Sequence, residues 1–176
     1  MRDQIMSDFL KALASRDASP GGGATAALHV AQAAALVAGC AGDRDVVAEA
    51  RALSMHALRL AEKAAHAVAT VGRARPDDQQ ARRNACVPPA DVIAASAVVL
   101  DLVERVPPDP RVVTDLAAAA EAARAAAVTA RVSIEVQLAG LPEDTALRES
   151  VATVGEICER ADRVTEGIRS GVALSR

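Results

Sequence analysis

Aromatic residues are almost absent from this chain of 176 residues: Phe9 is the only one among Phe, Tyr and Trp. A core without aromatic rings has to be built from aliphatic side chains, and apolar residues make up 51% of the sequence. Alanine and the branched aliphatic residues favour close contacts between helices. The length fits one helical domain over residues 1–176, which is large enough to bury a core without disulfides or metals.

The chain also has few cysteines and no large excess of charge of either sign. Cys40, Cys86 and Cys158 are widely separated, which does not fit a disulfide framework and is typical of a reducing cytosol. The formal net charge is −3, and acidic and basic residues are interspersed, which argues against a nucleic acid or an anionic membrane surface as a partner. We therefore predict a cytoplasmic protein with neither partner.

We also predict no signal peptide and no membrane-spanning apolar run. The N-terminal stretch MRDQIMSDFL has acidic residues where a signal peptide would be apolar. The most apolar stretch, residues 24–38, is interrupted by His29 and Gln32 and is predicted to be too short to span a bilayer.

Apolar residues recur along the chain mainly with the period of a helix, and almost no stretch has the alternation typical of a strand. We predict that Pro88 and Pro89 lie in the first turn of a helix. Proline has no amide proton to donate, and in the first turn this proton has no acceptor within the helix. A shorter polar segment, 77–86, precedes them. The predicted helices are 3–15, 24–38, 45–72, 88–105, 114–138 and a last helix within 147–172, with linkers at 16–23, 73–80 and 106–110. This order predicts an all-α fold, an antiparallel bundle of about six helices.

The many alanines predict a homodimer. Each buried alanine removes little apolar area from water, so a core made of alanine faces gains less than one made of larger side chains. A second copy that covers apolar stripes of the second, fifth and last helices would compensate. A tightly packed monomer is the alternative.

Three consecutive glycines, Gly21, Gly22 and Gly23, stand directly before an alanine-rich helix in SPGGGATAAL. Free amide donors and the positive end of the helix at such a turn suit a carboxylate or phosphate. No strand precedes the turn and no Gly-Lys-Ser/Thr follows, so it is neither a P-loop nor a Rossmann turn. Alternatively, the glycines only let the chain reverse and pass close to another helix.

The stretch FLKALASRDASPGGGATAAL resembles the start of the formiminotransferase-cyclodeaminase C-terminal family, the all-helical cyclodeaminases and methenyltetrahydrofolate cyclohydrolases, whose members carry FL..LAS followed by PxPGGGSxAAL. Looser similarity continues through LRLAEKAAHAV, ACVPPADV and VTDLAAAAEAARAAAVTARVSIEVQL. The resemblance implies a dimer of helical bundles that takes a tetrahydrofolate derivative as substrate and closes or opens its one-carbon bridge. It implies no metal and no tightly bound cofactor.

The resemblance places substrate-binding residues around the glycine turn. The turn residues Gly21, Gly22 and Gly23 are predicted to bind the folate, with the amides of Gly22, Gly23 and Ala24 and the hydroxyl of Thr25 as donors. His29 is predicted to point into the same pocket, with a half-exposed helix histidine as the alternative. Arg82, with its neighbour Arg83, is predicted to meet the anionic tail of the folate, or else to be a solvated loop charge.

At several positions the sequence departs from the family pattern. Gly39 and Ala64 stand where relatives have Asn and Asp, and Arg131 and Glu135 stand where they have Asn. Glu135, held by Arg131 four residues earlier, is predicted to be a catalytic base or a cation stabiliser, with a surface ion pair as the alternative.

Asp115 is retained from the family pattern and is the second catalytic candidate, with a helix cap as the alternative. It precedes Glu135 by about 30 Å of helix, so only an antiparallel dimer would bring the two carboxylates together. His56 and His66 are ten residues apart and do not form a metal-binding pair.

Three functions are consistent with these residues. The first is a cyclodeaminase or cyclohydrolase acting on a folate one-carbon bridge. The second is an enzyme on the same scaffold with a different ring closure or C–N bond step. The third is a catalytically silent helical dimer that binds a ligand or a protein.

Overall fold

The structure of the protein, a computed structural model, describes residues 6–15, 20–75, 77–142 and 144–174, with side chains through residue 170. Within these residues it contains helices and no strand, which confirms the all-α prediction. The helices are α1 (Met6–Leu13), α2 (Gly21–Cys40), α3 (Arg44–Arg73), α4 (Gln79–Glu104), α5 (Val113–Leu138), α6 (Thr145–Ala152) and α7 (Val154–Leu174).

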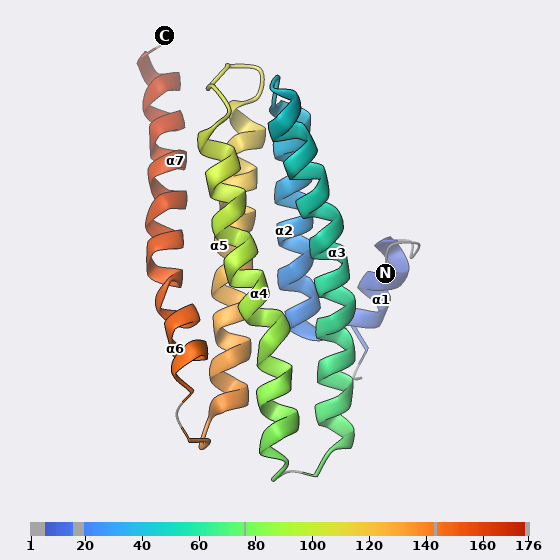
Figure 1. Ribbon diagram of the computed structural model, residues 1–176. Coiled ribbons are helices and arrows are strands. Elements are labelled where there is room, and N and C mark those ends of the chain that lie inside the picture. The colour runs from blue at the N-terminus through green and yellow to red at the C-terminus, as the bar shows by residue number, and fades with distance from the viewer. Residues whose placement is uncertain (1–5, 16–19, 76, 143, 175–176) are drawn as a thin grey trace.

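The four long helices α2, α3, α4 and α5 form an antiparallel bundle, and α7 lies along α5 (Figure 1). Their contact faces are largely alanine: Ala26, Ala33, Ala57, Ala119 and Ala126 are all fully buried. Because alanine has the highest helix propensity and the smallest side chain that still fills space, these faces stabilise the helices and let their axes approach closely.

Helix α2 begins earlier than predicted. Residues 16–19 of the predicted linker 16–23 lie outside the described residues, but Gly21, Gly22 and Gly23 form the first turn of the helix and are not a linker. Gly21 has φ +62°, which favours glycine. A Cβ built on Gly23 would lie 3.4 Å from the Cβ of Ala64, so the absent side chain lets α2 approach α3 closely.

The prediction that Pro88 and Pro89 open a helix is wrong. Both prolines lie inside α4, which runs without interruption through the predicted segments 77–86 and 88–105. Both are buried, and this packing outweighs the cost of about 3 kcal/mol that proline carries in an isolated helix. Figure 1 shows the axis of α4 changing direction partway along its length, as expected where proline removes helical hydrogen bonds.

Helix α5 confirms the predicted helix 114–138, and Gly140, with φ +76°, follows its end. Asp115 is not the cap: Val112 occupies that position, and Asp115 lies in the first turn, where its negative charge faces the positive end of the helix. The last predicted helix is divided at Thr153, whose hydroxyl donates a hydrogen bond to the carbonyl of Ser150 at 2.8 Å.

Two helices, α2 and α4, are long and apolar enough to cross a membrane by length and composition. The prediction that the apolar stretch in α2 is too short is therefore wrong, because the helix extends over 20 residues. Half of the apolar window in α2 and 61% of that in α4 are buried inside the protein. This degree of burial is typical of core helices in a bundle.

Candidate functional site

The glycine turn forms one wall of a cavity of about 300 Å³. The first turn of α2 meets the C-terminal half of α3, the N-terminal part of α4 and the C-terminal half of α5 there. The lining residues are Gly21, Gly22, Gly23, Ala64, Val68, Ala85, Pro89, Thr129, Val132, Ser133, Val136 and Gln137. All three predicted glycines therefore border one space, which is the candidate site.

The polar side chains of this cavity come from α5. Thr129, Ser133 and Gln137 are spaced by four residues, so they share one face of the helix. The Ser133 hydroxyl donates to the carbonyl of Thr129 at 3.0 Å. Our sequence reasoning missed all three residues. Their spacing in an otherwise alanine-rich helix was a usable signal, but only the packing of α5 against the start of α2 shows which ligand-sized space they face.

Backbone donors complete the polar part of the wall. The first amide groups of a helix have no acceptor within the helix itself, and the residue before α2, Pro20, provides no side-chain cap for them. A Cβ built on Gly22 would lie 3.8 Å from the Cγ2 of Thr129, which is ordinary van der Waals contact, so a methyl group fits here but a larger side chain would extend toward Thr129. These donors suit a neutral carbonyl or an anionic oxygen of a ligand.

None of the residues that line this cavity is ionisable. Ala64 contributes only a methyl group to the wall. One copy of the chain therefore offers hydrogen-bonding groups and apolar contacts here, but no lining side chain with a proton to exchange near neutral pH.

Thr25 and His29 lie on the next turns of α2 and do not line the cavity. The Thr25 hydroxyl donates to the carbonyl of Gly21 at 3.2 Å, back along its own helix. His29 is half-buried, and its Nδ1 is buried with no hydrogen-bond partner among the described residues. Both side chains belong to the outward face of α2.

Arg82 and Arg83 contact the segment that connects α5 and α6. Arg82 Nη2 donates to the carbonyl of Ala139 at 2.8 Å. Arg83 Nη1 contacts the Asp144 carboxylate at 2.9 Å, and its Nη2 donates to the carbonyl of Pro142 at 3.0 Å. Neither guanidinium lines the cavity. Arg82 attaches the start of α4 to the end of α5, and Arg83 attaches it to the start of α6.

Neither of the two predicted catalytic carboxylates, Glu135 and Asp115, lines the cavity. Glu135 pairs with Arg131, with 3.0 Å between its Oε1 and the arginine Nε, and both side chains are about half exposed. Asp115 lies at the other end of α5, beside Cys40. Burial and, secondly, the Asp115 carboxylate raise the pKa of the Cys40 thiol. The structure thus keeps the two carboxylates at opposite ends of α5.

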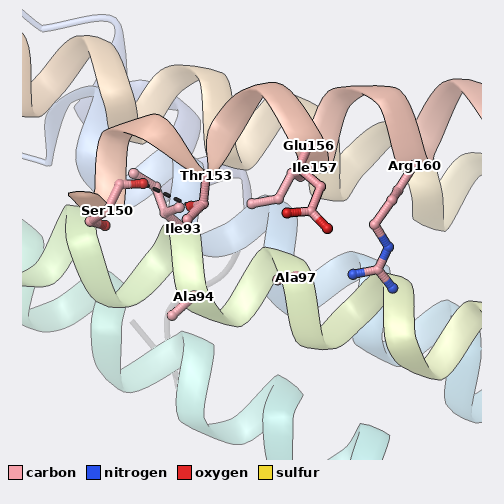
Figure 2. Close-up of a pocket in the computed structure, with 8 residues that line it drawn as sticks. All are labelled: Ile93, Ala94, Ala97, Ser150, Thr153, Glu156, Ile157 and Arg160. Atoms are coloured by element: carbon pink, nitrogen blue, oxygen red, sulfur yellow. Dashed lines mark hydrogen bonds between the residues drawn. The ribbon is translucent and has the colours of Figure 1, made fainter. Parts of the chain in front are cut away.

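A second groove, of about 400 Å³, lies between α4 and the α6–α7 segment (Figure 2). Figure 2 shows Glu156 and Arg160 extending from α7 toward α4. Arg160 contacts Glu104 at 3.0 Å and Asp101 at 2.6 Å, and the hydrogen bonds to these carboxylates, chiefly to Glu104, raise its pKa. This guanidinium therefore joins two helices and is not available to a ligand.

A third groove, of about 800 Å³, lies at the opposite end of the bundle, between the α4–α5 connection and α7. Its lining is mainly apolar, including Val106, Leu116 and Ile168. No group of three His, Cys, Asp or Glu side chains able to hold a metal is present in the part of the chain that the structure describes. Among these three spaces in the described part of the chain, the glycine-turn cavity is lined by residues that the sequence predicted to bind the ligand.

Comparison with known proteins shows which family shares this sequence pattern and fold. The sequence model of the formiminotransferase-cyclodeaminase family matches residues 5–156. The fold matches the crystal structure of formiminotetrahydrofolate cyclodeaminase from Thermotoga maritima with a TM-score of 0.79 and 24% sequence identity, over 95% of this chain and 98% of that chain. A search of curated proteins finds no match. Since the family match extends over the glycine turn and all the helices around the cavity, the chain belongs to the formiminotransferase-cyclodeaminase family.

Proposed function

We propose that this protein binds a reduced folate in the glycine-turn cavity and acts on its one-carbon bridge, as a cyclodeaminase or cyclohydrolase. The observation that carries the proposal is the cavity itself, where family-typical glycines border a ligand-sized space. A volume of about 300 Å³ is at the lower end of small-molecule sites. It suits the bicyclic ring of a folate, with the glutamate tail outside.

The residues that line the cavity provide the apolar contacts and hydrogen-bonding groups that such a ring needs. Val68, Pro89 and Val132 offer flat apolar contact, and the Gln137 amide has both a donor and an acceptor for the ring edge. The glycine amides supply further donors. Opening or closing the bridge also needs a proton donor or acceptor and a group that stabilises developing positive charge. Glu135 and Asp115 remain our predictions for these roles.

We also propose that residues 1–176 act as one helical domain, in the cytoplasm and as a homodimer. The alanine-rich core supports the dimer, because it buries little area per residue. The absence of Asp, Glu, Lys and Arg from all of α2, whose outward face is partly exposed, supports it further.

Titration with tetrahydrofolate, followed by the loss of methenyl-tetrahydrofolate absorbance, tests the proposal. In Gly22→Val the side chain extends toward Thr129, and we expect at least about tenfold weaker binding with helical circular dichroism retained. Gly22→Ala, whose methyl group fits at 3.8 Å, should bind nearly as the wild type does. Gly72→Val, at an open position of α3, controls for a β-branched residue in a helix.

Two results would contradict the proposed binding site, and a third would contradict folate as its ligand. Unchanged affinity in Gly22→Val would place the ligand elsewhere. Unfolding of Gly22→Val, with Gly72→Val folded, would show that the turn is chiefly architectural. Binding of folate by neither wild type nor Gly22→Ala would reject folate as the ligand.

Ligand binding without turnover is the second candidate function. It is favoured by the lack of any ionisable side chain among the cavity-lining residues. The same experiment separates the two functions, because a silent binder would hold tetrahydrofolate and leave the methenyl absorbance unchanged.

A further inference from the structure

We propose that the groove between the α4–α5 connection and the C-terminal half of α7 binds an aliphatic carboxylate, with the chain on its apolar floor and the head group at Arg163. This space, the α7 groove, has a volume of about 800 Å³, which is within the range of small-molecule sites. It is a site separate from the folate cavity, because no residue lines both spaces.

The floor of the α7 groove consists of buried aliphatic side chains. Val103, Val106 and Leu116 line the groove and are only 4%, 6% and 3% exposed. All three belong to the hydrophobic core, so the groove extends down to the core of the bundle. A space of this size over core side chains favours an apolar occupant, whose binding removes that surface from water.

The two walls of the groove come from segments far apart in the chain. Pro108 and Pro110 belong to the α4–α5 connection, and a proline ring fixes φ and has no amide proton, so this wall is stiff. Val164 and Ile168 form the other wall and are four residues apart, on one face of α7. Figure 1 shows the connection at the same end of the bundle as the C-terminal end of α7.

Gly167 keeps the α7 side of the groove free of a side chain. It lines the groove, and a Cβ built on it would meet no atom within 4 Å. Glycine is among the least favourable residues in the interior of a helix, and here no close approach of another helix requires it. A glycine at this position therefore leaves room for a ligand at a cost to the helix.

The charges at the groove favour an anionic head group. Glu104 and Arg163 are its ionisable lining residues. Both carboxylate oxygens of Glu104 accept from Arg160, at 3.1 and 3.0 Å, so this negative charge is compensated. Among the described residues Arg163 pairs with Glu159, at the long distance of 3.9 Å, and its side chain is 65% exposed. Its guanidinium is available to a carboxylate, which it can bind through two hydrogen bonds.

A small aliphatic acid fits these features better than a polypeptide does. A peptide would bring backbone N–H and C=O groups against a largely aliphatic lining, where unpaired polar groups are costly to bury. A second copy would have to cover the neighbouring surface of α7, where Glu159, Glu166 and Arg169 are 75%, 68% and 81% exposed. Charged side chains of this kind are depleted from the core of protein interfaces.

Calorimetric titration with octanoate, decanoate and dodecanoate, each below its micelle concentration, tests the apolar floor. Each added CH₂ should tighten binding by about two- to fourfold. Arg163→Gln should weaken dodecanoate binding by about three- to fivefold and leave binding of uncharged dodecan-1-ol unchanged. Arg169→Gln is the matched control on the same helix, because Arg169 does not line the groove. Equal loss of acid and alcohol in Arg163→Gln would contradict the proposed position of the head group.

Filling the groove tests its location. Gly167→Leu should weaken dodecanoate binding by at least about tenfold. Its Tm should equal or exceed that of the wild type, because leucine favours a helix and no atom lies near the new Cβ. Gly155→Leu, at another open glycine of α7 that does not line the groove, is the control and should bind as the wild type does. Both variants should keep the wild-type affinity for tetrahydrofolate.

Methyl NMR on the wild type locates the ligand without any substitution. Dodecanoate should shift the methyl resonances of Leu116, Val164 and Ile168 and leave those of Val68 and Val132, in the glycine-turn cavity, in place. No binding by the wild type, unchanged affinity in Gly167→Leu, or shifts at the glycine-turn cavity alone would overturn the proposal. Shifts of the groove methyls with protein concentration alone would show that a second copy covers the groove, and would overturn it as well. Failure to bind tetrahydrofolate would reject the proposed function and leave this site unaffected.

Discussion

Removing Arg83 tests whether the guanidinium groups near the α5–α6 connection hold the fold or a ligand. Arg83 Nη1 contacts the Asp144 carboxylate at 2.9 Å, and its Nη2 donates to the carbonyl of Pro142 at 3.0 Å. Asp144 also caps α6 by accepting from the amide of Leu147 at 3.2 Å. In Arg83→Ala the aspartate keeps this cap but loses its cation.

The expected cost follows from burial. The side chains of Arg83 and Asp144 are 26% and 28% exposed, so the pair is neither a fully solvated surface pair nor a dry one. A hydrogen bond to a charged group contributes about 1.5–3 kcal/mol when it is well shielded, and an exposed ion pair contributes about 0–1 kcal/mol. Loss of both contacts should lower the free energy of unfolding by about 1.5–2 kcal/mol. For a chain of this length that is a fall in Tm of roughly 3–8 °C.

Thermal unfolding followed by far-UV circular dichroism measures this directly. Arg83→Lys should fall between wild type and Arg83→Ala, because an ammonium group keeps the charge but cannot make both contacts in the same geometry. Arg82→Ala, which loses one contact, to Ala139, should cost less than Arg83→Ala. Arg169→Ala removes a guanidinium from a side chain that is 81% exposed and should stay within about 0.5 kcal/mol of wild type.

Folate affinity decides between the two roles. If Arg82 and Arg83 serve the fold, their alanine variants should lose stability and keep their affinity for tetrahydrofolate below the melting transition. An unchanged Tm together with a large loss of affinity would refute the structural assignment and support the predicted role with the folate tail.

Three further predictions concern other parts of the bundle. Burial raises the pKa of the Cys86 thiol to about 11, so alkylation at pH 8 should modify the half-buried Cys158 well before Cys86; fast labelling of Cys86 in folded protein, detected by peptide mass spectrometry, would contradict this burial. Hydrogen bonds from Arg111 lower the pKa of Asp109 to about 2, so the contribution of this pair is present above the ordinary aspartate pKa and is lost as the pH falls toward about 2. In an NMR titration Arg111→Ala should move the Asp109 midpoint up toward its ordinary value, and an unmoved midpoint would show that Arg111 is not the cause. Ala127→Leu adds volume where the side chain is fully buried, and should lower the free energy of unfolding by about 1–3 kcal/mol; denaturant unfolding with wild-type stability would reveal space in the alanine core that the structure does not show.

The candidate site was predicted in part. The three glycines could be identified from the sequence because their spacing before a helix has a local physical meaning, and the structure places all three on the cavity wall. Arg131 and Glu135 were correctly expected to be close enough to pair, since residues four apart on a helix are neighbours. That neither of them lines the cavity was not predictable, because it depends on how α5 is rotated against α2.

The amino-acid sequence by itself determined the helical class, the position of α5 and the end of that helix at Gly140, because alanine propensity, periodicity and a left-handed glycine act within a few residues. Only the tertiary structure decided that α4 continues through Pro88 and Pro89, that α2 begins at Gly21, and that Thr129, Ser133 and Gln137 face the glycine turn. These features depend on contacts between segments far apart in the chain, and the energy of such packing exceeds local preferences of a few kcal/mol.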